Sequence, residues 1–283
     1  MPVVVVTGAS GKLGRAVVAE LAVHGYDVVT TDRTPPPSGQ PGSFTRADLT
    51  DLGQVVELLT GVDERYDHVD AVVHLAAIPA PGLFTSGATF ANNVPATFNV
   101  FQAAKIAGIT KVVWASSETL LGLPFDVPPP YVPVDEEYRV LPNSTYSIGK
   151  AVEEELAHHF ARWNPELSII ALRFSNVMAP TDYAQFSTWQ NDSSARRWNL
   201  WGYIDARDGA QAVRLAVESP LVGFETFIIA NADTVMERPS AELVAEVFPG
   251  AEVHGELVGN QTLLGIEKAR RLLGYAPQHS WRD

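Results

Sequence analysis

The chain has 283 residues, no cysteine and a formal net charge of −13. This length allows one large core, or one core with a small annex. The absence of cysteine excludes disulfides, thiol nucleophiles and zinc–thiolate sites. The acidic charge argues against a nucleic-acid partner, because binding to a phosphate backbone depends on Lys and Arg. No run approaches the roughly 18 apolar residues of a membrane span, and no signal peptide precedes the first strand. We therefore expect a cytoplasmic protein that binds neither nucleic acid nor membrane.

Short apolar strands alternate with helices along most of the chain. Val3–Val6 is a β-branched run typical of a strand buried on both faces, and Leu13–His24 has helical periodicity that ends at Gly25. Further strands are expected at Asp27–Thr31, Ala71–Leu75, Lys111–Ala115, Ser168–Arg173 and Phe224–Ile229, and further helices near Leu52–Thr60, Thr89–Ala107, Thr145–Trp163 and Asp208–Glu218. This alternation predicts βαβ units and a parallel sheet.

The regular pattern loosens after Pro180. Residues 185–200 are polar and rich in aromatic side chains, and two helical stretches follow at 240–247 and 262–273. The sequence therefore predicts an α/β fold, a Rossmann-type doubly wound parallel sheet with a small C-terminal annex. We place the first domain at residues 1–179 and a second region at 180–283, with segments at about 203–230 returning to the sheet.

A glycine-rich turn connects the first strand to the first helix. Gly8 allows a tight turn out of the strand, Gly11 lets the backbone approach a pyrophosphate, and Gly14 lets the helix pack close to the sheet. The free N–H groups at the start of the helix then face the phosphates. This context predicts a dinucleotide site. Its contacts in the turn are expected from Gly8, Ser10, Gly11, Lys12, Leu13 and Gly14.

Asp32 ends the second strand, eighteen residues after Gly14. Its carboxylate can accept hydrogen bonds from the adenosine ribose and would repel a 2′-phosphate, which favours NAD over NADP. Arg33 and Lys12 could offset a phosphate charge, so NADP is the alternative. Asp48, which follows a short third strand, is either a contact to the adenine or the N-cap of the next helix.

Tyr146 and Lys150 stand four residues apart, on one face of an expected helix, and Ser117 precedes Tyr146 by twenty-nine residues. The cation favours the phenolate, so we expect Tyr146 to act as a base near neutral pH. Asn143 and Ser144 are suitable N-cap residues for this helix. The acidic run 153–155 in the same helix is interpreted as a solvated face.

The histidines are candidate metal ligands, but their positions do not favour a metal site. His74 lies at a strand end, where we expect a packed and hydrogen-bonded ring rather than a metal ligand. His158 and His159 are neighbours on a helix and do not share a face, which argues against a chelate. We expect no metal site.

Together these motifs resemble the extended short-chain dehydrogenase/reductase superfamily, in particular its sugar epimerase/dehydratase group. The resemblance covers nearly the whole chain. It rests on Thr7–Gly14, Asp32, Asp48-Leu49, His74-Leu75-Ala76-Ala77, Asn92-Asn93-Val94, Ser116-Ser117, Tyr146 with Lys150, Arg173-Phe174-Ser175-Asn176 and the tail 268–277. It implies that residues 1–179 bind NAD(P) and carry the catalytic residues, and that residues 180–283 mainly bind substrate.

The resemblance also implies a role for each matched residue. Tyr146 would be the catalytic acid/base, Ser117 the hydroxyl that polarises the substrate oxygen, with Ser116 as its neighbouring candidate, and Lys150 the group that binds the nicotinamide ribose. The remaining cofactor contacts would come from Asp48, Leu49, Leu75, Ala76, Ala77, Asn93 and Phe174, and the remaining substrate contacts from Ser175 and Asn176. The helix pair that contains 94–107 and Tyr146 resembles the dimer bundle of this superfamily, which implies a homodimer.

The expected reaction is NAD-dependent oxidation of a hydroxyl on a sugar-like molecule or polyol. The reason is that only about a hundred residues follow Pro180, which is a short region for binding a nucleotide sugar. The segment Ser187-Thr188-Trp189 resembles uronate dehydrogenases, but their carboxylate-binding arginine would fall near Ala184. Either Arg196 or Arg197 replaces that arginine, or the substrate is neutral, so a uronate is only a candidate. The alternative is a nucleotide-sugar epimerase/dehydratase, for example of the UDP-hexose 4-epimerase type, for which Glu118 offers one carboxylate. A non-catalytic dinucleotide-sensing regulator is disfavoured by the catalytic trio.

Overall fold

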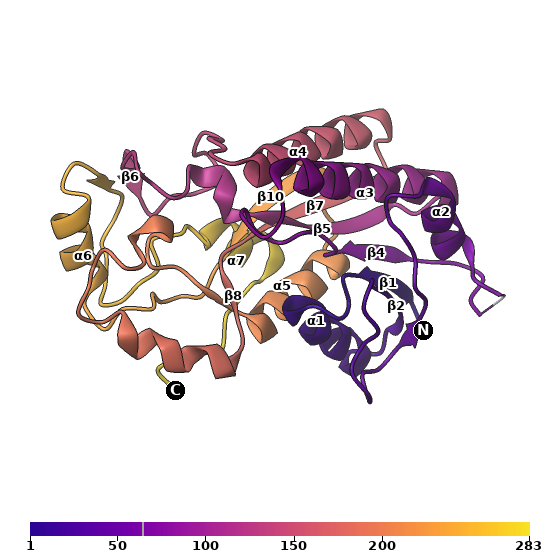
Figure 1. Cartoon of the computed structure of the whole chain (residues 1–283), viewed down its shortest axis with the longest axis horizontal. Coiled ribbons are helices and arrows are strands. Elements are labelled where there is room, and N and C mark those ends of the chain that lie inside the picture. Colours follow the sequence, from indigo (N-terminus) through magenta and orange to yellow (C-terminus); the bar gives the residue numbers. More distant parts are fainter. Residues whose placement is uncertain (64) are drawn as a thin grey trace.

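A seven-stranded parallel sheet forms the centre of the molecule (Figure 1). The structure, a computed structural model, describes residues 1–63 and 65–283. The strand order is β10-β7-β5-β4-β1-β2-β3. The chain therefore winds outward from β1 in both directions, which confirms the predicted doubly wound Rossmann-type sheet.

The regular elements follow the predicted alternation. The sheet strands are β1 (Val3–Thr7), β2 (Asp27–Thr31), β3 (Ser43–Phe44), β4 (Ala71–His74), β5 (Lys111–Ser117), β7 (Ser168–Phe174) and β10 (Gly223–Ile229). The α-helices are α1 (Lys12–Val23), α2 (Leu52–Thr60), α3 (Ser86–Ala107), α4 (Thr145–Trp163), α5 (Ala206–Glu218), α6 (Ser240–Val247) and α7 (Glu267–Leu273). Short strands and 3-10 turns complete the set: β6 (Tyr131–Val132), β8 (Val177–Met178), β9 (Ile204–Asp205), β11 (Glu252–Val253), η1 (Glu118–Leu121), η2 (Pro180–Thr188) and η3 (Arg197–Asn199).

Helices cover both faces of the sheet, which explains why the strands lack polar alternation. Val4 and Val6 of β1 join the apolar core beneath α1 and α5, whereas Val3 and Val5 join the core beneath α2, α3 and α4. Every residue of β1 is therefore buried. Figure 1 shows α3 and α4 on one side of the sheet and α1 and α5 on the other. This is the pattern expected of a parallel sheet buried on both faces.

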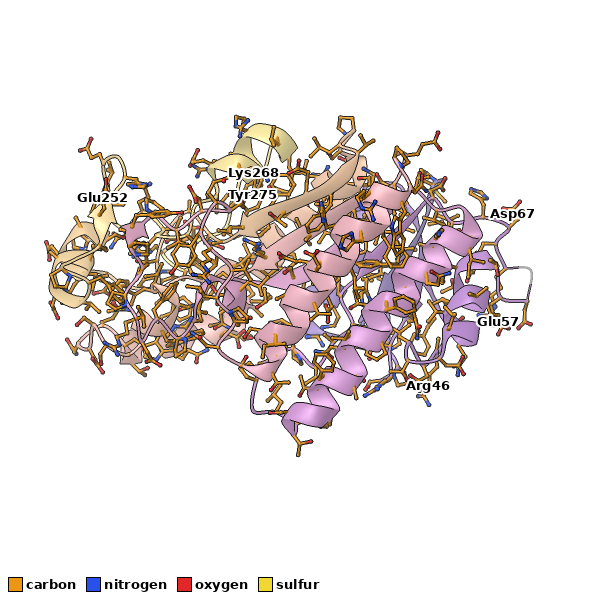
Figure 2. All side chains as sticks on the ribbon, turned by 90° about the horizontal axis from the view of Figure 1, so that it is seen from above. Arg46, Glu57, Asp67, Glu252, Lys268 and Tyr275 are labelled. Atoms are coloured by element: carbon orange, nitrogen blue, oxygen red, sulfur yellow. The ribbon has the colours of Figure 1, made fainter. Side chains whose placement is uncertain are left out.

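The later part of the chain both extends the sheet and builds a smaller annex beside it. After β7 the chain forms η2 and η3, and it then returns through β9 and α5 to β10, which pairs with β7 at the sheet edge. The annex contains α6 and the β6–β11 pair. Glu252 of β11 and Asp67 near β4 lie at opposite ends of the molecule (Figure 2). No described helix is long and apolar enough to cross a membrane.

Two expectations about the helices were wrong. The last helix begins at Glu267 rather than at Thr262, because the preceding N–H groups bond elsewhere: Thr262 N–H donates to Ala232 O and Gly265 N–H donates to Val134 O. In the acidic run of α4, Glu153 and Glu154 are buried and only Glu155 is exposed. Burial is tolerated because both acids face cations, as described below.

Candidate active site

One continuous pocket of about 1290 Å³ runs from the glycine turn to the 3-10 turn η3. Ligand pockets for small molecules measure roughly 300–1,000 Å³, so this volume suits a dinucleotide together with a second molecule. Every residue expected in the site lines the pocket except Asn93. These lining residues are Gly8, Ser10, Gly11, Lys12, Leu13, Gly14, Asp32, Arg33, Asp48, Leu49, Leu75, Ala76, Ala77, Ser116, Ser117, Tyr146, Lys150, Phe174, Ser175 and Asn176.

The glycine turn has the close backbone approaches that its motif requires. A Cβ at Gly8, whose φ is +71°, would lie 2.6 Å from Ala76 N, and a Cβ at Gly14 would lie 2.1 Å from Gly8 O. The N-cap of α1 is Gly11, which contributes no side-chain cap, so the first N–H groups of the helix face the pocket without one. These features fit a pyrophosphate.

Asp32 occupies the end of β2 beside this turn. Its carboxylate accepts hydrogen bonds from the N–H groups of Ser10, at 3.0 Å, and Thr34, at 3.1 Å. One lone pair on each oxygen remains for a ribose hydroxyl. Two cations could have offset the charge of a 2′-phosphate, but both have partners within the protein. Lys12 pairs with Asp182, and Arg33 donates to the Asn92 amide oxygen. This pairing strengthens the preference expected for NAD.

Asp48 lines the pocket and does not cap a helix. The N-cap of α2 is Asp51, whose carboxylate accepts from Gly53 N–H and Gln54 N–H. Asp48 instead accepts from the N–H and the hydroxyl of Thr50, and these bonds lower the pKa of its carboxyl. Of the two interpretations that the sequence left open, the N-cap role is therefore wrong.

Asn93 lies behind the pocket wall rather than in it. Its buried side chain accepts from Ile78 N–H at 2.8 Å and donates to Ile78 O at 3.0 Å. Ile78 itself lines the pocket, beside the predicted contacts Leu75, Ala76 and Ala77. Asn93 therefore holds the loop that follows β4, and its expected role on the nicotinamide side would be exerted through that loop.

The structure separates the roles of the two adjacent serines at the end of β5. The Ser116 hydroxyl donates to Glu154 at 2.6 Å and is consumed by that bond. The Ser117 oxygen accepts from the N–H and the hydroxyl of Thr119, at 3.2 and 3.0 Å, which leaves its own proton free to be donated. Ser117 is therefore the better placed hydroxyl.

Tyr146 stands in the first turn of α4, where the Ser144 side chain caps the helix as predicted. Burial raises the pKa of the Tyr146 phenol, and Lys150 and a hydrogen bond with Ser117 only partly offset that effect. Lys150 lowers the pKa of Tyr146, as expected. The pKa is nevertheless raised overall, whereas a base that titrates near neutral pH would need a lowered pKa. The difference comes from desolvation of the buried phenol, which the sequence does not reveal.

Lys150 is buried beneath the pocket with two strong partners. Its ammonium donates to Ala115 O at 2.8 Å and to Glu153 at 2.9 Å, and it lies 5.1 Å from the centre of the Trp114 ring. Burial lowers the pKa of Lys150, but Glu153 and Tyr146 outweigh it, so the pKa is raised. The residue therefore remains a cation at neutral pH.

Buried polar groups close the other end of the pocket. Glu118 is 4% exposed, and its carboxylate accepts from the Ser175 hydroxyl at 2.6 Å and from the Asn199 amide at 3.2 Å. Burial raises the pKa of Glu118 to about 7. Arg196 does not line the pocket, and it donates to the Asn176 amide oxygen at 3.1 Å. Trp198 and Asn199, which sequence reasoning missed, belong to this end.

His74 lies inside the core, whereas His158 and His159 lie at the surface. His74 bonds to Thr7 at 2.7 Å and Thr97 at 3.1 Å, as expected for a packed ring. Contrary to expectation, His158 and His159 approach a common point, because Glu155 lies one turn before both, and ligand atoms of the three residues lie within 4.8 Å of one another. The cluster is mainly exposed, and none of its three residues lines the pocket, although they lie on the same helix as Tyr146 and Lys150.

Comparison with known proteins gives a family match over most of the chain. The model of the NAD dependent epimerase/dehydratase family matches residues 4–230. The UDP-glucose 4-epimerase of Erwinia amylovora is 28% identical over 214 residues, which are 71% of this chain and 60% of that enzyme. The NAD-dependent glucose-6-phosphate dehydrogenase of Haloferax volcanii is 29% identical over 188 residues, 62% of this chain and 68% of that enzyme. The chain thus spans less than two thirds of the length of the first of these relatives.

A solved structure is similar over nearly the full chain. MoeE5 in complex with UDP-glucuronic acid and NAD is 26% identical, with a TM-score of 0.73, and the match covers 99% of this chain and 95% of that one. The same protein has been solved in complex with UDP-glucose and NAD. Chain length alone therefore does not separate the two reactions that the sequence left open.

Proposed function

The chain belongs to the NAD dependent epimerase/dehydratase family, and on that basis we propose that it oxidises a hydroxyl-bearing carbon of a sugar-like molecule. The observation that carries the proposal is the placement of Ser117, Tyr146 and Lys150 along one pocket with the glycine turn. NAD, when bound, supplies the hydride acceptor. Tyr146 accepts the proton of the hydroxyl oxygen, and the hydride of the carbon that bears this hydroxyl would pass to the dinucleotide, so the overall products would be a carbonyl compound, NADH and one proton.

Each residue of the trio has a task that follows from its contacts. The free hydroxyl proton of Ser117 is donated to the phenol oxygen or to the substrate oxygen. Lys150 lowers the pKa of Tyr146, and its bonds to Ala115 O and Glu153 hold the ammonium beside the phenol. The deprotonated phenol then accepts the hydroxyl proton.

Net oxidation is favoured over epimerisation by the distribution of charge along the pocket. Among the described lining residues, Arg15 and Arg33 lie at the glycine-turn end, and Lys150 lies beneath Tyr146. Lys12 starts from the glycine turn, and its ammonium donates to Val177 O and is paired with Asp182. The substrate end offers no further Lys or Arg to a diphosphate, which nucleotide sugars carry and which cations commonly bind. A substrate without a nucleotide diphosphate fits this end better.

The second candidate is a nucleotide-sugar 4-epimerase, which the names of the relatives support. Purified protein incubated with NAD and a panel of hexoses, uronates and UDP-sugars separates the two. Formation of NADH in amounts equal to the oxidised sugar supports the proposal. Conversion of a UDP-sugar into its isomer without net NADH would replace it by the epimerase. Binding of NAD with no turnover of any compound would favour a sensing regulator.

We also propose a cytoplasmic homodimer, and a division of labour between residues 1–179 and 180–283. Support for the dimer comes from α3 and α4, which lie side by side on one face of the molecule (Figure 2). Their exposed apolar side chains are Phe90, Phe98, Ile106, Ile148, Val152 and Trp163. Light scattering tests the proposal: Val152→Glu should shift the protein toward the monomer, and a wild-type monomer at all concentrations would contradict it.

A further inference from the structure

A buried polar cluster lies behind the substrate end of the pocket and links the turn η3 to the ends of β5 and β7. We call it the Arg196 cluster; its members are Glu118, Ser175, Asn176, Arg196 and Asn199. All except Asn176 are less than one tenth exposed. Glu118, Ser175 and Asn176 line the pocket, whereas Arg196 and Asn199 lie behind them. Its hydrogen bonds therefore decide which polar atoms a substrate meets.

Arg196 is buried behind the pocket lining and bonded within the protein. Its guanidinium carbon lies 4.8 Å from the ring centre of Trp189 and 4.6 Å from that of Trp198. Its terminal nitrogens donate to Asn176 Oδ1 at 3.1 Å and to Gly202 O at 3.0 Å. Two aromatic faces and two hydrogen bonds fix the charge in this place.

This contact sets the polarity of Asn176. Arginine has only donors, so the amide oxygen of Asn176 must face Arg196. The NH2 group of Asn176 is then the part of the side chain left for the pocket that this residue lines. A substrate at this position meets a hydrogen-bond donor without a formal charge, and a hydroxyl oxygen satisfies it.

Glu118 adds an acidic group on the same side. Its carboxylate is held by the Ser175 hydroxyl, the Asn199 amide and the backbone N–H of Asn176. A carboxylate on the substrate would lie near this acid, and the lysine of the described pocket lining that approaches this end, Lys12, is already paired with Asp182. Because the pKa of Glu118 is about 7, its carboxylate is charged mainly above that pH, and there juxtaposed like charges are a common means of rejecting a wrong ligand.

We infer that the pocket selects a sugar that is uncharged at the group facing Asn176 and Glu118, rejects the corresponding uronate, and uses Arg196 as the positioning residue for the Asn176 amide. This inference rests on the proposed function and names its substrate class. It also revises the expectation that Arg196 would bind a substrate carboxylate, because its terminal nitrogens are bonded within the protein.

The test compares neutral hexoses with their uronates, as free sugars and as UDP-sugars, on the NAD-loaded wild-type protein at a pH of about 8.5, above the pKa of about 7 of Glu118, so that its carboxylate is charged. Calorimetry measures binding, and NADH formation measures turnover. We expect at least tenfold tighter binding of the neutral member of the preferred pair. If neutral sugars bind selectively but yield no NADH, the proposed oxidation fails and the selectivity stands. Equal binding, tighter binding of the uronate, or binding of neither member overturns the selectivity.

Variants assign the effect to residues. Glu118→Gln should reduce the discrimination between the two sugars at least tenfold, and Glu137→Gln, an exposed acid of the 131–138 region, should leave it unchanged. Arg196→Lys should raise KM for the neutral sugar about tenfold more than it lowers kcat, with KM for NAD unaffected. Arg197→Lys, the exposed neighbour, is its control. A general loss of structure would lower kcat and NAD affinity together, and a KM unchanged in Arg196→Lys would overturn the positioning role.

Discussion

Arg173 and Glu154 form a buried, bidentate ion pair that joins β7 to α4, the helix of Tyr146 and Lys150. Arg173 Nε lies 2.9 Å from Glu154 Oε1, and its terminal nitrogen lies 2.8 Å from Oε2. The Ser116 hydroxyl donates to the same carboxylate. Strand and helix are therefore tied together directly beneath the pocket.

Removal of the charge on Glu154 should destabilise the protein strongly. Breaking a buried pair on one side leaves an uncompensated charge, here that of Arg173, and such losses cost about 3–5 kcal/mol. We expect Glu154→Gln to lower the free energy of unfolding by about that amount in urea titrations. Glu155→Gln, its exposed neighbour on α4, should change it by less than about 0.5 kcal/mol. Equal effects of the two variants would contradict a structural role of the pair.

The acidic run that contains these residues illustrates what sequence reasoning could reach. The helix, its N-cap Ser144 and the strands were predictable, because glycine turns, apolar runs and caps are local signals. The burial of Glu153 and Glu154 was not, because it depends on Lys150 one turn away and on Arg173 from another element. Charge runs in a sequence do not reveal which members face partners.

In the candidate site, too, some residues could be predicted from local sequence signals and others could not. In the dinucleotide half, the glycine turn and Asp32 follow from a motif with fixed spacing, whereas the other expected contacts follow from the family resemblance; the pocket contains all of them except Asn93. The substrate half contains Trp198 and Asn199, which lie in a stretch of 3-10 turns without periodicity. Only tertiary contacts, such as the hydrogen bond from the Asn199 amide to Glu118, hold this stretch against the pocket.

Tyr146→Phe should abolish hydride transfer without preventing dinucleotide binding. The variant keeps the ring but loses the atom that accepts the proton, and positioned acid/base groups contribute about 10²–10⁴-fold to rates. We expect a fall of that size in kcat, with an unchanged Kd for NAD. Tyr66→Phe is the control, because the Tyr66 hydroxyl bonds to Leu58 O away from the pocket. Retention of full activity in Tyr146→Phe would refute the assigned chemistry.

The rate of oxidation should rise as the pH is raised above neutral. The active form of Tyr146 is the phenolate, and burial raises the pKa of this phenol above its ordinary value, so the active fraction increases toward alkaline pH. Lys150→Met removes the main influence that lowers this pKa. We expect it to displace the rising limb of the pH–rate profile further toward alkaline pH. A limb displaced toward acid would show that Lys150 does not act through the phenol.

Asp32→Ala should relax the preference for NAD over NADP. The variant removes the charge that would repel a 2′-phosphate, and it frees the N–H groups of Ser10 and Thr34 to donate to an anion. We expect the ratio of kcat/KM for NADP to that for NAD to rise at least tenfold, which corresponds to about 1.4 kcal/mol. Asp27→Ala, at the exposed opposite end of β2, is the control. An unchanged ratio would exclude Asp32 as the discriminating group.

Glu118 should make the protein less stable as the pH rises from about 4.5 to about 7. Its pKa in the folded chain is about 7, above the 4.5 of an unperturbed glutamate. Between those values the folded state keeps a proton that the unfolded state releases, so the contribution to stability is present at low pH and is lost as pH rises through the folded pKa.

The size of that loss follows from the same two pKa values. A difference of about 2.5 units corresponds to roughly 3 kcal/mol. Because a glutamine side chain does not titrate, the stability of Glu118→Gln relative to wild type should increase by roughly 2–3 kcal/mol between about pH 5 and about pH 8. Using this difference removes the opposing effect of His74, whose pKa burial lowers to about 3 in both proteins. A relative stability that stays constant over this range would mean that the Glu118 carboxyl titrates normally, and that its charge is already present in weak acid.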